Sequence, residues 1–537
     1  MKKLALGAAI AAAMFGAAAQ AAIPTIDPAN TRVLYISGAS AAATFIDKLV
    51  TSTNVDPTDR ICDPSSQVYR FRDSAGPAGT DQFAIYCKAN NTGAVGVKNP
   101  NLPTGTANAN LLIYKRNTGG SGNGVTPVAQ ATPLAFLNIS TGCTEVSAGN
   151  LSTPADISCP NINNNQIPDL GLSDVDPIQF KGNSAINGVD ISATDVAKLT
   201  VKAASALTFG APVTWDLYRT LQAAQKSTND LPVSCLIGDR TEACMPNLTS
   251  AQIASIHAGK WADWNALKVG DSATAPGLHD WALSQTTAVP AFGGGNVTIA
   301  DLAPADAPFL HTCRREVGSG TQAQSNIIFL GDGCTTAALA LTPLDATDGD
   351  FAEGDGIAII HSNSSTGRVD ACLRNLQNGN STVSGFTNDW GKRWAIGILS
   401  LEKANAAYEF VKVDGVAPTL ANVVEGKYKD WAENTFQYRN NTSSAPLTGD
   451  KKTLADAIIK SAGAPSVMAD LNGGFVHAFG NGAYLAVPSN FASVNGRFDS
   501  ARPVTPYSHA VKTGASSFAP ANACRVPTIW GGGAGQL

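Results

Sequence analysis

The chain has 537 residues and a formal net charge of −5, and only 15% of its residues are charged. It is too long for one ordinary domain, so we expect two lobes or more. The slight excess of acidic residues gives no support to nucleic-acid binding, which depends on a basic surface, so no nucleic-acid partner is expected.

The first residues predict export. Lys2 and Lys3 precede an apolar run, residues 4–19, and Ala19-Gln20-Ala21 then provides the small-x-small pattern of a cleavage site. We expect a signal peptide over residues 1–21 and a mature start at Ala22. The run is too short to cross a bilayer, and no cysteine lies near the cleavage site to accept a lipid. The sequence therefore predicts a periplasmic or secreted protein without a lipid anchor.

The mature chain contains ten cysteines, an even number that predicts disulfides in an oxidising compartment. Because short loops close at little entropic cost, we expect the cysteines to pair in sequence order. The expected pairs are Cys62–Cys87, Cys143–Cys159, Cys235–Cys244, Cys313–Cys334 and Cys372–Cys524. No CxxC, HxxxH or HExxH spacing occurs, so we expect neither a metal site nor a cofactor.

The chain opens with a strand–turn–helix pattern. Arg32–Ser37 predicts a buried strand and Ser40–Val50 a helix, and Gly38-Ala39-Ser40 forms the turn between them. Residues 51–110 are rich in Asn, Pro, Gly and Thr, and we interpret them as an insertion stapled by a disulfide. Such a start is typical of an α/β domain.

Two further strands end in polar turns. Leu111–Tyr114 predicts a strand followed by a glycine-rich turn, residues 119–124, and Asp169–Leu172 predicts a strand followed by Ser173-Asp174. Residues 143–165 are interpreted as a second irregular loop. Leu207–Val213 predicts an extended segment that returns to the core.

The domain organisation follows from these patterns. Residues 216–394 have their own strands and helices, and Trp394–Leu401 resumes the strand-then-helix pattern. After the signal peptide we expect residues 22–214 to form the first part of lobe I and residues 215–394 to form lobe II. Residues 395–537 then complete lobe I and add a C-terminal extension. The predicted fold is α/β with two lobes.

The most informative motif is Arg315-Glu316-Val317-Gly318-Ser319-Gly320-Thr321, which precedes a predicted helix. The first turn of a helix has free N–H groups and a positive dipole end, and both favour an anion. Arg315 adds a planar pair of donors. Taken alone, such a glycine-rich helix start is more often a capped turn.

Asp174 would lie at the same sheet edge, because ligands of open α/β sheets collect at the carboxyl ends of strands. A carboxylate can accept a hydrogen bond only from an anion that still carries a proton. Hydrogen phosphate has one and sulfate at neutral pH has none, so Asp174 would exclude sulfate. The alternative is that Asp174 caps the turn that follows it.

The sequence resembles the periplasmic phosphate-binding proteins of phosphate ABC transporters, in the class of type II solute-binding proteins. The resemblance is carried by Leu248–Asn265, with its Gly259-Lys260 and Trp264-Asn265, by Arg315–Thr321, and by Ala395–Ile398 with Val411–Thr419 and Asn422–Tyr428. It implies a periplasmic-binding-protein type II fold with hinge strands and disulfide-stapled loop insertions.

The resemblance also implies a set of phosphate-binding residues, each from a turn described above. They are Ser40, Thr44, Phe45, Ser121, Asp174, Arg315, Ser319, Gly320 and Thr321. One position departs from the family, which has Asp two residues after the arginine where this chain has Val317. Either Glu316 or another neighbour compensates, or Arg315 is held less firmly.

The expected function is the capture of inorganic phosphate, or a similar oxyanion, for uptake or scavenging, by a monomer that serves an inner-membrane phosphate ABC permease. The alternative is a secreted or surface structural or adhesion protein on the same scaffold, with weak or no anion binding. The sequence contains no evident nucleophile–base pair, so no enzyme activity is expected.

Overall fold

The computed structural model describes residues 23–530 except 42, 53, 74–80, 187, 306–307, 335–352, 355, 381, 384–385, 388–389, 492–495 and 513–517. The predicted signal peptide, residues 1–21, lies outside the described residues. Within them, no helix is both long and apolar enough to cross a membrane.

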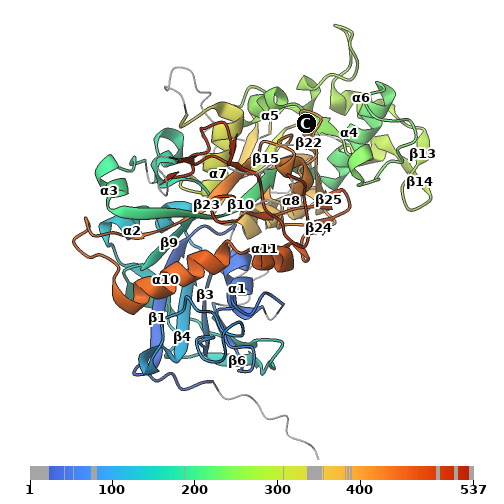
Figure 1. The fold of residues 1–537 in the computed structure, drawn as a ribbon. Coiled ribbons are helices and arrows are strands. Elements are labelled where there is room, and N and C mark those ends of the chain that lie inside the picture. Colours follow the sequence, from blue (N-terminus) through green and yellow to red (C-terminus); the bar gives the residue numbers. More distant parts are fainter. Residues whose placement is uncertain are drawn as a thin grey trace, which may run out of the picture.

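The larger of two sheets forms the lower lobe in Figure 1. Its order is β20 (Leu399–Ser400), β10 (Leu199–Gly210), β23 (Trp431–Arg439), β9 (Leu170–Ser173), β1 (Thr31–Gly38), β4 (Asn110–Arg116), β3 (Gln82–Lys88), β2 (Tyr69–Arg72), β7 (Ala155–Ser158) and β6 (Thr144–Ser147), and β26 (Tyr484–Ala486) pairs with β10. Strands β4 and β9 run parallel to β1 on either side of it. The three strands therefore end at the same edge of the sheet.

Alternating side chains of β4 pack on the two faces of this sheet, as the period of a strand requires. Leu111 and Ile113 belong to the main core, whereas Leu112 and Tyr114 belong to a smaller cluster with Phe136. The main core lies beneath helices that cross the sheet (Figure 1). These are α1 (Ala43–Thr51), α10 (Gly449–Ala462) and α11 (Pro465–Asn472), and the short helices α2 (Thr126–Gln130) and α3 (Ala193–Ala197) belong to the same lobe.

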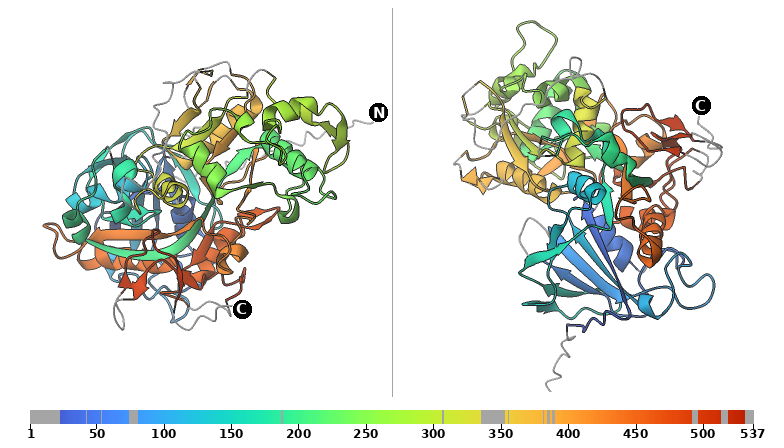
Figure 2. Two further views of the ribbon diagram at one scale, coloured as in Figure 1. Left: turned by 90° about the horizontal axis from the view of Figure 1, so that it is seen from above. Right: turned by 90° about the vertical axis from the view of Figure 1, so that its left-hand side faces the viewer.

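The smaller sheet forms the core of the second lobe, seen above the first in the right-hand view of Figure 2. Its order is β16 (Ile359–Asn363), β15 (His311–Arg315), β19 (Ala395–Gly397), β11 (Pro212–Thr214) and β21 (Tyr408–Phe410). The helices of this part are α4 (Trp215–Ser227), α5 (Ser250–His257), α6 (Leu278–Ser284), α7 (Gly320–Ser325), α8 (Thr366–Asn378) and α9 (Leu420–Val424).

Helix α8 illustrates how the sequence specifies these elements. Ser365 caps its N-terminus by accepting a hydrogen bond from the N–H of Arg368, and Gly379, with φ of 75°, ends it in the left-handed conformation. Val369, Cys372, Leu373 and Leu376 follow the spacing of one helix face and are all buried. The helix therefore packs this face against β15 and β19.

The remaining strands form two-stranded ribbons. They are β5 (Leu134–Leu137) with β8 (Ile162–Gln166), β12 (Asn247–Leu248) with β22 (Lys412–Val413), β13 (Ala288–Pro290) with β14 (Asn296–Thr298), β17 (Thr382–Val383) with β18 (Phe386–Thr387), β24 (Val476–His477) with β25 (Gly480–Asn481), β27 (Tyr507–Ser508) with β30 (Thr528–Ile529), and β28 (Val511–Lys512) with β29 (Phe518–Ala519).

The chain crosses between the lobes at short extended segments. One crossing joins β10 to β11 at Ala211, a second joins β19 to β20 at Ile398, and a third leads from β22 to β23. The predicted fold, two α/β lobes with hinge strands and disulfide-stapled loops, is confirmed. The lobe limits expected at residues 214 and 394 remain predictions.

The two segments interpreted as irregular contain strands. Residues 51–110 supply β2 and β3, and residues 143–165 supply β6, β7 and β8. These strands extend the larger sheet beyond β4 or pair with β5, and Cys62–Cys87 and Cys143–Cys159 fasten the adjoining loops. These strands were not predicted because they are only four to seven residues long and lie among Gly, Pro and Asn residues, which are typical of loops.

All ten cysteines are paired, as predicted. Three predicted bridges are confirmed, namely Cys62–Cys87, Cys143–Cys159 and Cys235–Cys244. The other two predictions are wrong, because the bridges are Cys313–Cys372 and Cys334–Cys524. Cys313 lies on β15 and Cys372 lies on α8, which packs against β15, so packing within the lobe brings this pair together. Cys334 therefore pairs with Cys524 of the C-terminal segment.

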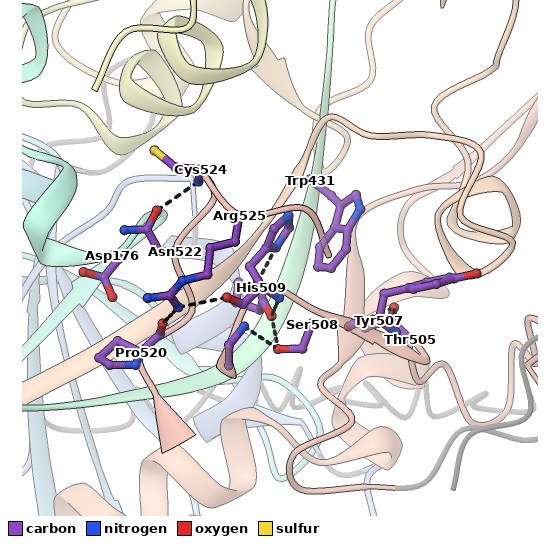
Figure 3. A network of polar contacts seen from close by, with 12 residues as sticks. Asp176, Trp431, Thr505, Tyr507, Ser508, His509, Pro520, Asn522, Cys524 and Arg525 are labelled. Atoms are coloured by element: carbon purple, nitrogen blue, oxygen red, sulfur yellow. Dashed lines mark hydrogen bonds and ion pairs between the residues drawn. The ribbon is translucent and has the colours of Figure 1, made fainter. Parts of the chain in front are cut away.

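The C-terminal segment, residues 505–512 and 518–530, returns to strand β23 of the larger sheet (Figure 3). Ser508 Oγ and the N–H of His509 both donate to Glu433 Oε1, at 2.6 and 2.9 Å, and His509 Nδ1 lies 2.6 Å from Glu433 Oε2. The His509 ring packs on Trp431 with 4.4 Å between ring centroids. The Cys334–Cys524 bridge fastens the same segment just beyond α7 and its π-helical continuation, residues 326–330.

Candidate functional site

Seven of the predicted site residues meet between the two sheets. Ser40, Ser121 and Asp174 follow β1, β4 and β9 of the larger sheet, whereas Arg315 ends β15 of the smaller sheet and the turn after it supplies the others. We call this group the interlobe cluster, which consists of Ser40, Ser121, Asp174, Arg315, Ser319, Gly320 and Thr321. All of its side chains are buried.

The turn after β1 approaches β9 so closely that it requires glycine. Gly38 has φ of 114°, and a Cβ at this position would lie 2.0 Å from the carbonyl oxygen of Leu172. The N–H of Ala39 donates to that same oxygen at 2.9 Å. Only glycine adopts this conformation in this space, so Gly38 is what allows the chain to turn into Ser40.

Arg315 is 1% exposed and crosses from the smaller lobe to the larger one. Its Nη1 donates to Ser40 Oγ at 3.0 Å and to Thr366 Oγ1 at 3.3 Å. Nε donates to the carbonyl oxygen of Asn363 and Nη2 to that of Ser364, each at 3.0 Å. Four of its five N–H donors therefore have acceptors, all of them neutral. Burial lowers the pKa of the guanidinium, and the charges of Glu316, Asp174 and Asp81 oppose this.

Asp174 is the buried acidic group of the interlobe cluster. Its Oδ2 accepts from Ser121 Oγ at 3.3 Å and from Thr321 Oγ1 at 3.2 Å, and its Oδ1 accepts from Asn434 Nδ2 at 3.3 Å. Burial raises the pKa of Asp174, and the charge of Arg315 is the largest opposing effect. Asp176, not Asp174, caps the turn that follows, so the alternative capping role for Asp174 is wrong.

The start of α7 touches the larger lobe directly. Ser319 caps this helix by accepting from the N–H of Gln322 at 3.4 Å. A Cβ on Gly320 would lie 2.4 Å from Ser121 Oγ and 2.8 Å from Asp174 Cβ. A side chain at position 320 would therefore force the lobes apart.

The two predicted residues of α1 are placed differently from the rest. Phe45 is fully buried and packs on Tyr484 and Phe436, with ring centroids 5.4 and 6.4 Å apart, so its ring belongs to the core. Its N–H lies in the first turn of α1, where helix donors have no intrahelical acceptor. Thr44 belongs to the same turn, and its side chain lies outside the described residues.

The partners that hold Arg315 were not predicted from the sequence. The carbonyl groups of Asn363 and Ser364 occupy the role expected for a carboxylate, whereas Val317 is 47% exposed. Thr366 joins Arg315 and Ser40 at the start of α8. The sequence did contain a signal for Thr366. Ser364-Ser365-Thr366 connects a strand to a helix, as the turns of the interlobe cluster do.

Two buried ionisable residues beside the interlobe cluster were also missed. Lys115 is the penultimate residue of β4 and is 1% exposed, and Glu402 follows β20 and is 6% exposed. A lysine that follows an apolar run and a glutamate before a lysine carry no sequence pattern that would single them out.

Comparisons with known proteins find likeness in structure only. No protein-family model and no curated protein matches the sequence. A putative phosphate ABC transporter substrate-binding protein with bound phosphate from Clostridium perfringens is 15% identical, over 82% of this chain and 98% of its own, with a TM-score of 0.37. A phosphate-binding protein from Stenotrophomonas maltophilia is 11% identical, over 80% of this chain and 89% of its own, with a TM-score of 0.30. Likeness at this level assigns neither a ligand nor a role.

Proposed function

We propose that this protein is an exported solute-binding protein that holds inorganic phosphate, or a similar oxyanion, between its two lobes. The observation that carries the proposal is the interlobe cluster, in which a buried arginine, a buried aspartate and four hydroxyl groups come from turns of both lobes. The proposed use is uptake or scavenging, with delivery to an inner-membrane permease.

The donors of the interlobe cluster suit a tetrahedral anion. Arg315 supplies charged N–H groups, and Ser40, Ser121 and Thr321 supply hydroxyls that rotate to face an oxygen. Gly320 and Thr321, which open α7, lie against Ser121 and Asp174, and the first N–H groups of a helix have no acceptor within it. Because these groups are buried, an anion bound among them would interact in a low dielectric, where charge-assisted hydrogen bonds are strong.

The hydrogen bonds that Asp174 accepts within the interlobe cluster are longer than the bonds that the same donors would form with an anion. The bonds of Asp174 to Ser121, Thr321 and Asn434 are 3.2–3.3 Å long, near the upper limit for oxygen and nitrogen donors. An oxyanion that takes up the hydroxyl and guanidinium donors would form shorter, charged bonds in their place. Binding therefore exchanges weak mutual contacts for strong ones.

Asp174 supplies the proposed selectivity. An ionised Asp174 would accept a hydrogen bond from the proton of hydrogen phosphate. Sulfate has no proton to donate, so its negative oxygens would repel the carboxylate. Phosphate is thus expected to bind and sulfate to be rejected, although the two ions have the same shape.

Calorimetric titration of the mature protein, dialysed free of anions, with phosphate and then with sulfate tests the proposal. Phosphate should bind at one site per chain and sulfate should bind at least about a hundredfold more weakly, since one unpaired buried charge costs several kcal/mol. Absence of phosphate binding, or equal affinity for the two anions, would contradict the proposal and favour a secreted structural or adhesion protein on the same scaffold.

A further inference from the structure

Lys115 is a buried cation directly beneath the turn that contains Ser40. Its Nζ donates to the carbonyl oxygens of Gly38, Ala39 and Arg116, at 2.9, 3.1 and 3.2 Å, and to Asn117 Oδ1 at 2.7 Å. An ammonium group has three N–H donors and an amine has only two, so four surrounding oxygens favour the charged form. Lys115 therefore brings a second positive charge to the turn whose Ser40 hydroxyl accepts from Arg315.

Glu402 is linked to the same turn through Tyr484. Tyr484 Oη lies 2.7 Å from Glu402 Oε2 and 3.2 Å from the carbonyl oxygen of Ala41, which follows Ser40. The hydroxyl has one proton and cannot donate to both oxygens. When it donates to Ala41, the short contact with Glu402 requires a proton on the carboxyl group. Among the described residues, the other oxygen, Glu402 Oε1, is buried without a hydrogen-bond partner.

We infer that Lys115 and Glu402 are further residues of the proposed anion site, and that they restrict it to a singly charged oxyanion that carries a proton. With Arg315 and Lys115 charged, Asp174 ionised and Glu402 neutral, the site has one net positive charge, which a singly charged anion balances. The inference rests on the proposed function, and it names the charge state of the ligand.

Loss of a proton from Lys115 and loss of a proton from Glu402 both make the net charge of the site more negative. Burial lowers the pKa of Lys115 to about 7 and raises the pKa of Glu402 to about 7. As the pH rises through 7, the site loses a positive charge and gains a negative one, so both changes disfavour an anion. Affinity for phosphate should fall more steeply with pH than the ionisation of phosphate alone requires.

Other charged groups face these residues. Asp174 interacts with both Lys115 and Glu402, Arg116 lies beside Lys115, and Lys403 lies beside Glu402. Glu316 and Asp81 act on Arg315, and both are partly exposed to solvent, which weakens their effect. Of these groups, only Asp174 is buried within the interlobe cluster, and it is the same in the wild type and in the variant compared below.

The test compares phosphate affinity at pH 6 and pH 8.5 in the wild type and in the double variant Lys115→Arg with Glu402→Gln, whose charges are fixed. The decrease should be at least about tenfold larger in the wild type, one power of ten for each pKa unit of coupling. Glu409→Gln is the matched control, because burial also raises the pKa of Glu409 to about 7 and this residue lies on β21, away from the interlobe cluster. This control should behave as the wild type does.

A second measurement needs no substitution. Calorimetry at pH 8 in buffers of different ionisation enthalpy counts the protons taken up on binding, and phosphate itself accounts for about one at most. Uptake of more than one proton supports the inference. Uptake of one or fewer, or equal pH dependence in the wild type and the double variant, overturns it and leaves the proposed function standing. Absence of phosphate binding at every pH overturns both.

Discussion

The guanidinium of Arg315 donates to Ser40 Oγ at 3.0 Å, although 275 residues separate them in the sequence. Ser40 follows the first strand of the larger sheet, and Arg315 ends a strand of the smaller one. This contact between the lobes is one that an anion would share or replace, which makes Arg315 the first residue to test.

Arg315→Lys should weaken phosphate binding by roughly ten- to a hundredfold. Lysine keeps the charge but loses the planar pair of donors, and one charge-assisted hydrogen bond contributes about 1.5–3 kcal/mol. Calorimetry measures the change. Arg72→Lys is the matched control, because Arg72 pairs with Asp156 at an edge of the larger sheet and should leave the affinity unchanged. Wild-type affinity in Arg315→Lys would exclude Arg315 from the binding site.

Asp174→Asn should reduce selectivity more than it reduces phosphate affinity. The amide of asparagine can donate to any oxyanion and adds no negative charge, so sulfate should bind more tightly than it does to the wild type. The ratio of phosphate to sulfate dissociation constants is the quantity to measure. Asp176→Asn is the control, since Asp176 is buried nearby but caps the following turn. An unchanged ratio in Asp174→Asn would show that another group rejects sulfate.

Val317→Asp should change phosphate affinity by less than about threefold. Val317 is half exposed, and the carbonyl groups of Asn363 and Ser364 already hold the guanidinium of Arg315. A carboxylate exposed to water contributes little at a distance. Titration of this variant distinguishes the two means of holding Arg315, because a large gain in affinity would mean that the carbonyl groups do not hold it firmly.

Removal of the Cys334–Cys524 bridge by a double substitution to serine should lower the free energy of unfolding by about 2–5 kcal/mol. The bridge joins residues 190 positions apart and restricts the unfolded chain accordingly. Denaturant titration measures the loss. The matching removal of Cys143–Cys159, with a separation of 16, should cost less. A larger loss for the shorter loop would show that native packing, not loop length, decides the stabilisation.

Glu433→Gln should destabilise the protein by at least about 1.5–3 kcal/mol at neutral pH, the contribution of one hydrogen bond to a charged group, because its amide cannot reproduce the bonds that the buried carboxylate accepts from Ser508 and His509. Burial tends to raise the pKa of Glu433, but attraction to His509 and hydrogen bonds from Ser508 and His509 more than offset this, so the net pKa is lowered. A lowered pKa stabilises the folded state above the ordinary value of 4.5, and this contribution disappears as the pH falls below it.

The difference between Glu433→Gln and wild type should therefore shrink below about pH 4.5, as thermal unfolding at several pH values would reveal. Glu425→Gln provides a control just before the same strand, because Glu425 is exposed and pairs with Lys427 at the surface. It should change stability by less than about 0.5 kcal/mol at any pH. A constant difference for Glu433→Gln across the pH range would contradict the argument.

Local sequence patterns determined the elements and the turns of the candidate site. The run Arg32–Ser37 predicted β1, and Arg315–Thr321 predicted a glycine-rich turn before a helix start, because neighbouring residues decide strand burial and helix capping. The parallel order of strands then brings Ser40, Ser121 and Asp174 to the same sheet edge, as expected for an α/β fold.

Contacts between distant segments were decided by the tertiary structure alone. Cys313 pairs with Cys372 because α8 packs on β15. A pairing rule based on the distance between cysteines in the sequence cannot predict that packing. The carbonyl groups that hold Arg315 and the oxygens around Lys115 belong to the backbone, which every residue has. Backbone acceptors leave no trace in a sequence, so only the path of the folded chain places them beside a buried cation.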